Sequence, residues 1–236
     1  MHDSIVGVPE HLPVPLVLAT ANADKVREIL EVFTERFGIA FVAQPLEFDA
    51  VTYGHVMAPA ARAESLLGVA LAARPDMDET ADTLAGNARI KAEGLRAVTG
   101  ATCIADDTGL VVDALGGAPG VHSARYAGPS GEYAANVAKL LRELEATPPL
   151  GRTARFLTVI HGARADGGEF VVDGAVEGTI TAEPRGAGTF GYDPVFVPVD
   201  GDGRTFAEMA PTEKHALSHR GRAVRALLDL LTAQES

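Results

Sequence analysis

Apolar positions along the chain fall into two patterns: short apolar runs of strand length, and longer stretches whose apolar residues lie three or four positions apart. The short runs predict strands at residues 15–19, 41–43, 104–105, 110–112, 155–162, 169–176 and 195–197. The longer stretches predict helices at residues 26–37, 60–73, 83–99, 132–144 and 221–231. No internal repeat, low-complexity segment or linker interrupts these patterns, so we expect one folded unit after a loose lead-in at residues 1–13.

The composition limits the kinds of molecule that this protein can bind. With 32 acidic and 20 basic residues, the 236-residue chain has a formal net charge of −12, which repels nucleic acid and anionic membranes. An anionic ligand must therefore be met by a local basic site. A single cysteine, Cys103, excludes an internal disulfide. Residues 1–13 lack the basic and apolar regions of a signal peptide, and no apolar run is long enough to span a bilayer, so we expect a cytoplasmic protein.

Two adjacent acids interrupt the apolar stretch at residues 104–112. Asp106 and Asp107 stand side by side and are followed by Thr108 and Gly109. Because adjacent carboxylates repel each other and resist burial, at least one should be paired, hydrogen-bonded or bound to a cation. Neighbours on a strand point to opposite faces, so only one of the two can face a given cleft. The alternative is an Asx turn at the end of a strand, with Gly109 at a positive φ.

Cations stand at the starts of two predicted helices. Thr20 and Asn22 can cap the first helix, and Lys25 lies where the helix dipole disfavours a positive charge. A strand, polar turn and helix in this order point free N–H groups at an anion, so Lys25 needs an anionic partner. His219 and Arg220 take the same place in the last helix. A solvated surface lysine is the alternative for Lys25.

A glycine-rich loop at residues 185–194 carries two aromatic rings. Gly186 and Gly188 precede Phe190, Gly191 separates it from Tyr192, and Asp193 follows, so the ring faces are available to stack on a flat ligand. The alternative is an aromatic cluster that anchors the loop. His55 has no partner at a ligand spacing, and we interpret His161, at the end of an apolar strand, as a strand-edge residue and not as a ligand.

Only the combination of these features indicates a function. Phosphates would occupy the cationic sites, a divalent cation would link them to Asp107, and the aromatic loop would hold a base, so the predicted ligand is a nucleoside triphosphate. The chain has no G-x-x-x-x-G-K-[ST] motif, which argues against a P-loop. The simplest chemistry is attack of water on a phosphoryl centre, with magnesium polarising the phosphates and a carboxylate activating the water.

Five motifs resemble, in the same order, those of the inosine/xanthosine triphosphate pyrophosphatase family. They are T-x-N-x-x-K-x-x-E at 20–28, E-T-x-x-T-x-x-x-N-A-x-x-K-A at 79–92, ADDTGLVVDALGGAPGVHSARYAG at 105–128, FGYDP at 190–194 and EK-x-x-x-SHR at 213–220. The resemblance spans residues 16–231. It implies an α/β fold in residues 14–236, with an elongated mixed sheet flanked by helices and an active-site cleft between two lobes. It also implies a homodimer.

The implied reaction is magnesium-dependent cleavage between the α- and β-phosphates of dITP, ITP and XTP, which gives a nucleoside monophosphate and pyrophosphate. By this resemblance Asp107 is the general base, and Asp107 and Glu79 are the Mg²⁺ ligands. The residues that would bind the substrate are Thr20, Asn22, Lys25, Lys91, Thr108, Phe190, Gly191, Tyr192, Asp193, Lys214, Ser218, His219 and Arg220. A 6-oxo purine would accept hydrogen bonds at O6 and N7 from Lys214, His219 and Arg220. In adenine the 6-amino group is itself a donor, so these side chains would be left without an acceptor there.

The chain departs from the family pattern at several positions. Ala81 replaces a usual glycine, Gly86 replaces a usual glutamate, and Thr189 replaces a usual glycine. A segment at about 51–75 reads as an insertion. These departures leave two alternatives open: a pyrophosphatase with broader base choice, and a nucleotide-binding regulator that has lost activity through the change at Gly86.

Overall fold

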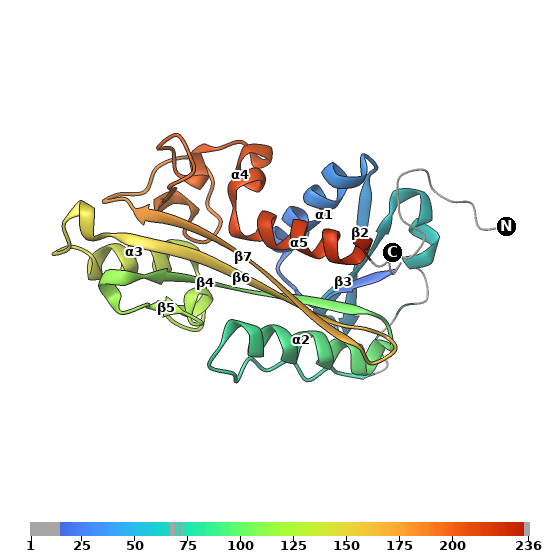
Figure 1. Ribbon diagram of the computed structural model, residues 1–236. Helices are drawn as coiled ribbons and strands as arrows, with labels where there is room; N and C mark the ends of the chain where they lie inside the picture. The colour runs from blue at the N-terminus through green and yellow to red at the C-terminus, as the bar shows by residue number, and fades with distance from the viewer. Residues whose placement is uncertain (1–14, 67–68, 70, 72, 234–236) are drawn as a thin grey trace. The chain divides into compact units, whose positions relative to one another are not determined.

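The computed structural model describes residues 15–66, 69, 71 and 73–233, so the predicted lead-in at 1–13 lies outside the described residues. The strands are β1 (Leu16–Leu18), β2 (Phe41–Phe48), β3 (Val51–Pro59), β4 (Cys103–Val112), β5 (Pro119–Gly120), β6 (Thr153–Ala163), β7 (Glu169–Ile180) and β8 (Phe196–Pro198). The α-helices are α1 (Ala23–Phe37), α2 (Leu84–Thr99), α3 (Tyr133–Glu143), α4 (Pro211–Leu217) and α5 (His219–Thr232) (Figure 1).

The strands form a mixed sheet, which confirms the predicted α/β fold with a mixed sheet and flanking helices. The strand order is β2-β3-β1-β4-β6-β7-β8, with β5 paired to β4. Strand β1 is parallel to β4 and antiparallel to β3. Strands β2–β3 and β7–β8 are antiparallel pairs.

The chain folds into two compact units. Unit 1 holds the described residues up to Asp107, residues Val159–Val172 and the described residues from Ala223 onward. Unit 2 holds Thr108–Thr158 and Asp173–Arg222. The boundary therefore falls inside β4, between Asp107 and Thr108, and each unit is described below by itself.

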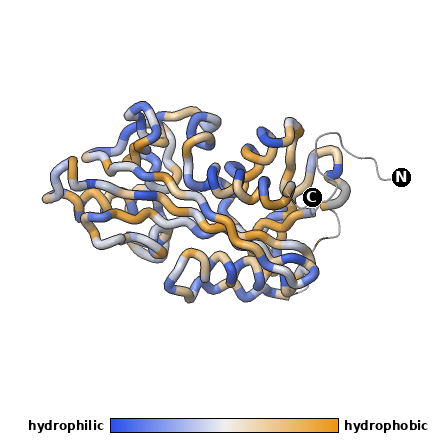
Figure 2. The backbone as a smooth tube through the Cα atoms, in the orientation of Figure 1, coloured by the Kyte–Doolittle hydropathy of each residue, from blue (hydrophilic) through white to orange (hydrophobic). Residues whose placement is uncertain are grey.

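Unit 1 packs helices on both faces of its strands. Successive residues of β1 point to opposite sides: Leu16 and Leu18 join an apolar cluster with α1 and α5, whereas Val17 joins a cluster with α2. Figure 2 shows apolar residues concentrated along these strands. Buried side chains therefore hold β1 on both of its faces and attach α2 to one of them. This packing fixes the positions of the polar residues on α2 and after β1.

Unit 2 has its own aromatic core. The rings of Phe156 and Phe196 lie 4.6 Å apart, and those of Phe196 and Phe206 lie 5.3 Å apart. Leu140 of α3 and Val195 are fully buried in the same cluster. This core supports two further segments: the loop that carries Phe190, and the short helix α4. The apolar pattern did not predict α4.

Two predicted segments differ from the structure. The predicted helix at 60–73 is a 3-10 helix over Ala60–Leu66, and several residues beyond it are outside the described part of the chain. Strand β3, from Val51 to Pro59, lies between β2 and β1 in the sheet. The insertion at about 51–75 stays a prediction.

Cys103 should be unreactive in the native protein. Its side chain is fully buried, and burial raises the pKa of its thiol to about 11, so the thiolate that reacts with disulfide reagents is scarce at mildly alkaline pH. A disulfide reagent such as DTNB should leave the native protein unmodified and titrate one thiol after unfolding in guanidinium. Rapid modification of the native protein would show that the β4 end opens.

Candidate active site

The loop between β1 and α1 is held by short polar contacts. The side-chain oxygen of Asn22 accepts hydrogen bonds from the backbone N–H groups of Asp24 (3.0 Å) and Lys25 (3.2 Å), so Asn22 is the N-cap of α1. The Thr20 hydroxyl accepts from the Asn22 N–H at 3.1 Å. His55 approaches from β3, with Nδ1 3.0 Å from the Thr20 carbonyl oxygen. The predicted cap is confirmed, and His55 takes a structural role here.

Lys25 has the anionic partner that its place in the helix requires. Its ammonium lies 3.0 Å from Oδ2 of Asp106, whose side chain is 1% exposed. The same ammonium approaches the Asp106 carbonyl oxygen at 3.4 Å. The sequence analysis assigned a role to Asp107 and none to Asp106. The pair of adjacent acids could have indicated a role for Asp106, because two buried carboxylates need two positively charged partners.

Lys91 is the second partner and the centre of the cluster. Its ammonium contacts Oδ1 of Asp107 (3.2 Å), Oε1 of Glu79 (2.8 Å) and the Asp106 carbonyl oxygen (2.9 Å). Burial lowers the pKa of Lys91, but the carboxylates around it outweigh burial and raise it, so the ammonium stays charged. Asn87, one turn earlier on α2, places Nδ2 3.5 Å from Oδ2 of Asp107.

Asp107 is a carboxylate in an environment that disfavours its charge. Burial raises its pKa above the usual range, and the ammonium groups of Lys91 and Lys25 only partly oppose this effect. A carboxylate whose pKa moves toward neutral pH is a better general base than an exposed one. The structure brings Lys25, Lys91, Glu79 and Asp107 together in unit 1, and their roles as phosphate and metal ligands stay predictions.

The acids do not lie at the end of a strand, and that expectation was wrong. Strand β4 runs without interruption through Asp106, Asp107, Thr108 and Gly109, and Gly109 is not among the described glycines with a positive φ. The alternative of an Asx turn is therefore excluded. The lysines explain the difference, because partners from α1 and α2 allow both acids to remain buried inside a strand.

The aromatic loop in unit 2 brings three predicted residues together. The ammonium of Lys214, on α4, lies 5.0 Å from the centre of the Phe190 ring, and the Arg220 guanidinium lies 5.6 Å from it. Tyr133, which sequence reasoning missed, meets the same ring edge-on at 5.4 Å. Lys214 is buried, and its ammonium lies 2.6 Å from Oδ2 of Asp193.

Further predicted residues surround this cluster. Arg220 donates to the Thr108 hydroxyl at 3.1 Å, and that hydroxyl lies 2.8 Å from the hydroxyl of Thr158. The Ser218 hydroxyl accepts from the Gly221 N–H at 3.1 Å, at the start of α5. Gly191 has φ 55°, a left-handed conformation that favours glycine.

Tyr192 and His219 are more deeply embedded than the prediction of a base pocket suggested. Tyr192 belongs to the core of unit 2, and its hydroxyl donates to the Ser123 carbonyl oxygen at 2.9 Å. Burial raises the pKa of Tyr192, so the phenol stays neutral. The His219 ring stacks on Phe156 at 4.4 Å. Their roles in ligand binding stay predictions, and both also anchor the residues beside them.

Two of the departures from the family pattern are linked by packing. A Cβ atom added at Gly86 would lie 2.6 Å from the Cβ of Ala81 and 3.0 Å from the Thr83 hydroxyl, which caps α2. A side chain at 86 therefore requires Ala81 or the start of the helix to move. Ala81 precedes the N-cap Thr83 and Gly86 lies in the first turn of α2, so the two departures meet in space.

Together, the described residues define an α/β protein with a buried cluster of lysines and carboxylates in one unit and a cation-flanked aromatic ring in the other. The sequence pattern of the Ham1 family matches residues 16–230, and the chain belongs to this family. Among the described residues, no helix is both long and apolar enough to cross a membrane.

Named relatives and solved structures agree with this assignment. A dITP/XTP pyrophosphatase of Geobacillus kaustophilus is 44% identical over 90% of this chain and 91% of its own length. One of Shigella flexneri is 43% identical over 92% of this chain and 97% of its own. A HAM1 protein structure from Coxiella burnetii superposes with a TM-score of 0.69 at 36% identity, covering 92% of this chain and 98% of that one.

Proposed function

We propose that this protein hydrolyses dITP, ITP and XTP to the nucleoside monophosphate and pyrophosphate. The observation that carries the proposal is the cluster in unit 1. There, Lys25 at the start of α1 and Lys91 on α2 form ion pairs with the two buried acids of β4. A protein that only bound nucleotides would need the cations but not a buried carboxylate with a raised pKa. The names of the relatives support the same substrates.

The triphosphate would be bound by residues of unit 1. Lys25 and Lys91 supply positive charge, and the Thr20 hydroxyl supplies a donor. The lysines are now engaged by Asp106 and Asp107. We infer that a bound polyphosphate shares these cations with the acids, so that charge is balanced in both states.

The carboxylates of Asp107 and Glu79 fit a divalent cation. Both converge on the Lys91 ammonium, at 3.2 and 2.8 Å, and Mg²⁺ in nucleotide enzymes is usually held by one or two carboxylates and the substrate phosphates. Bound there, Mg²⁺ would neutralise charge on the phosphates and polarise the phosphorus–oxygen bonds. Asp107 would accept the proton of the attacking water. Lys91 would keep Asp107 ionised and oriented.

The base would be read by residues of unit 2. Phe190 offers a half-buried ring, and the cations of Lys214 and Arg220 lie beside it. A 6-oxo purine presents acceptors at O6 and N7, whereas adenine presents its amino group. A donor left facing a donor costs about 1–3 kcal/mol, or roughly ten- to a hundredfold in discrimination per contact. Asp193 fixes the Lys214 ammonium and so orients this donor.

The remaining assignments rest on the family resemblance. We propose that the protein acts in the cytoplasm as a homodimer on a small-molecule substrate. We further propose that residues 14–236 form a single catalytic domain.

Pyrophosphate release from ITP, XTP, dITP, GTP and ATP tests the function. With Mg²⁺ present, ITP, XTP and dITP should react at least about tenfold faster than ATP, whose amino group at position 6 would face the donors of Lys214 and Arg220. GTP carries the same O6 and N7 acceptors, so its rate reports discrimination at position 2 of the base. Omitting Mg²⁺ with a chelator present should remove the activity. Comparable rates for all purines would favour the broader pyrophosphatase. Binding of ITP without turnover by folded protein would refute the enzyme and favour the regulator.

A further inference from the structure

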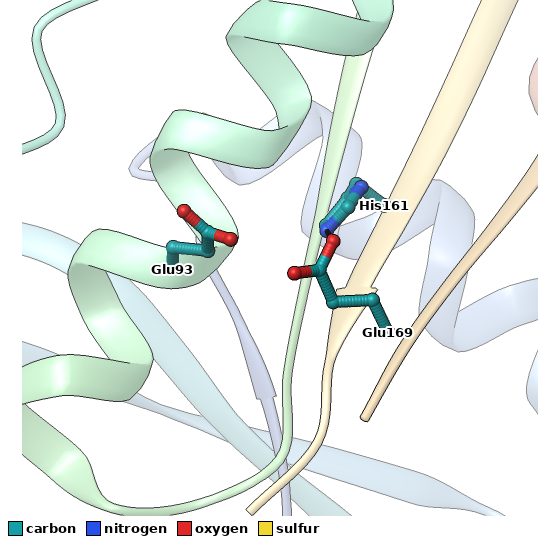
Figure 3. Close-up of side chains that lie close together, drawn as sticks. All are labelled: Glu93, His161 and Glu169. Atoms are coloured by element: carbon teal, nitrogen blue, oxygen red, sulfur yellow. Dashed lines mark ion pairs between the residues drawn. The ribbon is translucent and has the colours of Figure 1, made fainter. Parts of the chain in front are cut away.

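A second cluster of potential ligands lies in unit 1, on a different side of α2 from Lys91. It consists of Glu93 on α2, His161 on β6 and Glu169 at the first position of β7. One nitrogen or oxygen from each residue lies within 4.8 Å of the others. Figure 3 shows the two carboxylates and the imidazole gathered between the helix and the strands. None of the three belongs to the site described above.

His161 is the unusual member of this cluster. The residue is 3% exposed, and its Nε2 has no hydrogen-bond partner among the described residues. The nearest acid oxygen, Oε2 of Glu169, lies 3.4 Å away. A buried polar atom without a hydrogen bond costs about 1–3 kcal/mol, so such atoms mark strain, function or a bound partner. Burial also lowers the pKa of His161, which favours the neutral ring with a free lone pair.

Arg89 offers a different explanation for the acids alone. Its guanidinium contacts Oε1 of Glu93 at 2.9 Å and Oε1 of Glu169 at 3.1 Å, and its side chain is 56% exposed. This contact neutralises the two carboxylates but gives Nε2 of His161 no hydrogen bond. Each carboxylate also keeps a second oxygen. The interpretation of His161 as a strand-edge residue does not account for its burial or for the acids that face it.

We propose that Glu93, His161 and Glu169 bind one Zn²⁺ ion. Imidazole nitrogen with two carboxylates is a donor set that suits zinc, whereas Mg²⁺ prefers oxygen ligands alone. The three residues leave a fourth position for water. The ion ties α2 to β6 and β7, and α2 also carries Asn87 and Lys91. Zinc therefore stabilises the helix that holds Asp107 in place.

Calorimetric titration of the purified full chain with zinc, in excess Mg²⁺ to occupy the nucleotide site, tests this proposal. The wild type should bind one Zn²⁺ per chain and unfold at a higher temperature with zinc than without it. Glu93→Gln and Glu169→Gln alter partly exposed side chains, so both variants should fold, and each should bind zinc at least about tenfold more weakly. His161→Gln should do the same.

Arg89→Gln is the matched control, because it removes a charge from the same cluster without removing a ligand. Its zinc affinity should equal or exceed that of the wild type, since Arg89 competes for the carboxylates. Absence of zinc uptake by folded wild type would overturn the proposal. So would wild-type affinity in both glutamine variants, or an equal loss of affinity in Arg89→Gln.

Discussion

Asp107→Asn should lower the rate of pyrophosphate release from ITP by about 10²–10⁴-fold, the range usually lost with a general base. Asparagine keeps the size of the side chain but cannot accept the proton of water, and it is a poor ligand for Mg²⁺. The measurement is the turnover number at saturating ITP and Mg²⁺. Because asparagine has the same shape and Lys91 keeps its contacts with Glu79 and the Asp106 carbonyl oxygen, we expect the fold to persist, which circular dichroism would show.

Asp113→Asn provides the control for this prediction. Asp113 is an exposed acid just beyond β4, held by Arg155 and Thr153, and it lies outside the proposed site. Its replacement should leave the rate nearly unchanged, because exposed ion pairs contribute little. Equal activity of Asp107→Asn and the wild type would remove Asp107 from the mechanism and direct attention to Asp106.

Lys91→Met should destabilise the fold by about 3–5 kcal/mol, because it leaves buried carboxylates without their counter-ion. Methionine has nearly the same length and removes only the charge. The loss of the ammonium also raises the pKa of Asp107 further, and a base with a higher pKa becomes active only at higher pH. The acidic limb of the pH–rate profile should therefore move to higher pH in any activity that remains. Chemical denaturation and the pH profile measure the two effects.

A double-mutant cycle separates the charge effect from lost packing. If Lys91 acts by neutralising Asp107, the variant with both Lys91→Met and Asp107→Asn should be more stable than the sum of the single changes predicts. Strict additivity would show that Lys91 stabilises the protein through Glu79 or through packing alone.

Local signals explain why many elements could be predicted. Thr83 and Gly100 bound α2 as N-cap and left-handed C-cap, and both are residue types that favour those positions. The alternation of strand and helix was likewise readable from apolar spacing. Helix α4 was missed because it has only seven residues and begins with Pro211, so it offers too few turns for a periodic pattern.

Long-range pairing explains what the sequence alone could not supply. Strand β4 continues through its acids because Lys25 and Lys91, from two helices, compensate them. Likewise, nothing near His161 in the sequence predicts two glutamates beside it, since one comes from α2. Lys25 and Lys91 were predicted to bind phosphate because they occupy family motifs, and that role stays a prediction. The pairing of Asp106 could not be predicted, because it depends on where the ammonium of Lys25 lies in the fold.

The close approach of positions 81 and 86 couples the segment before α2 to the first turn of that helix. A Cβ atom at 86 would lie 2.6 Å from the Cβ of Ala81, so a side chain at 86 requires Ala81 or the start of the helix to move. The two positions therefore form one steric unit, and the effect of a substitution at 86 depends on whether residue 81 carries a methyl group.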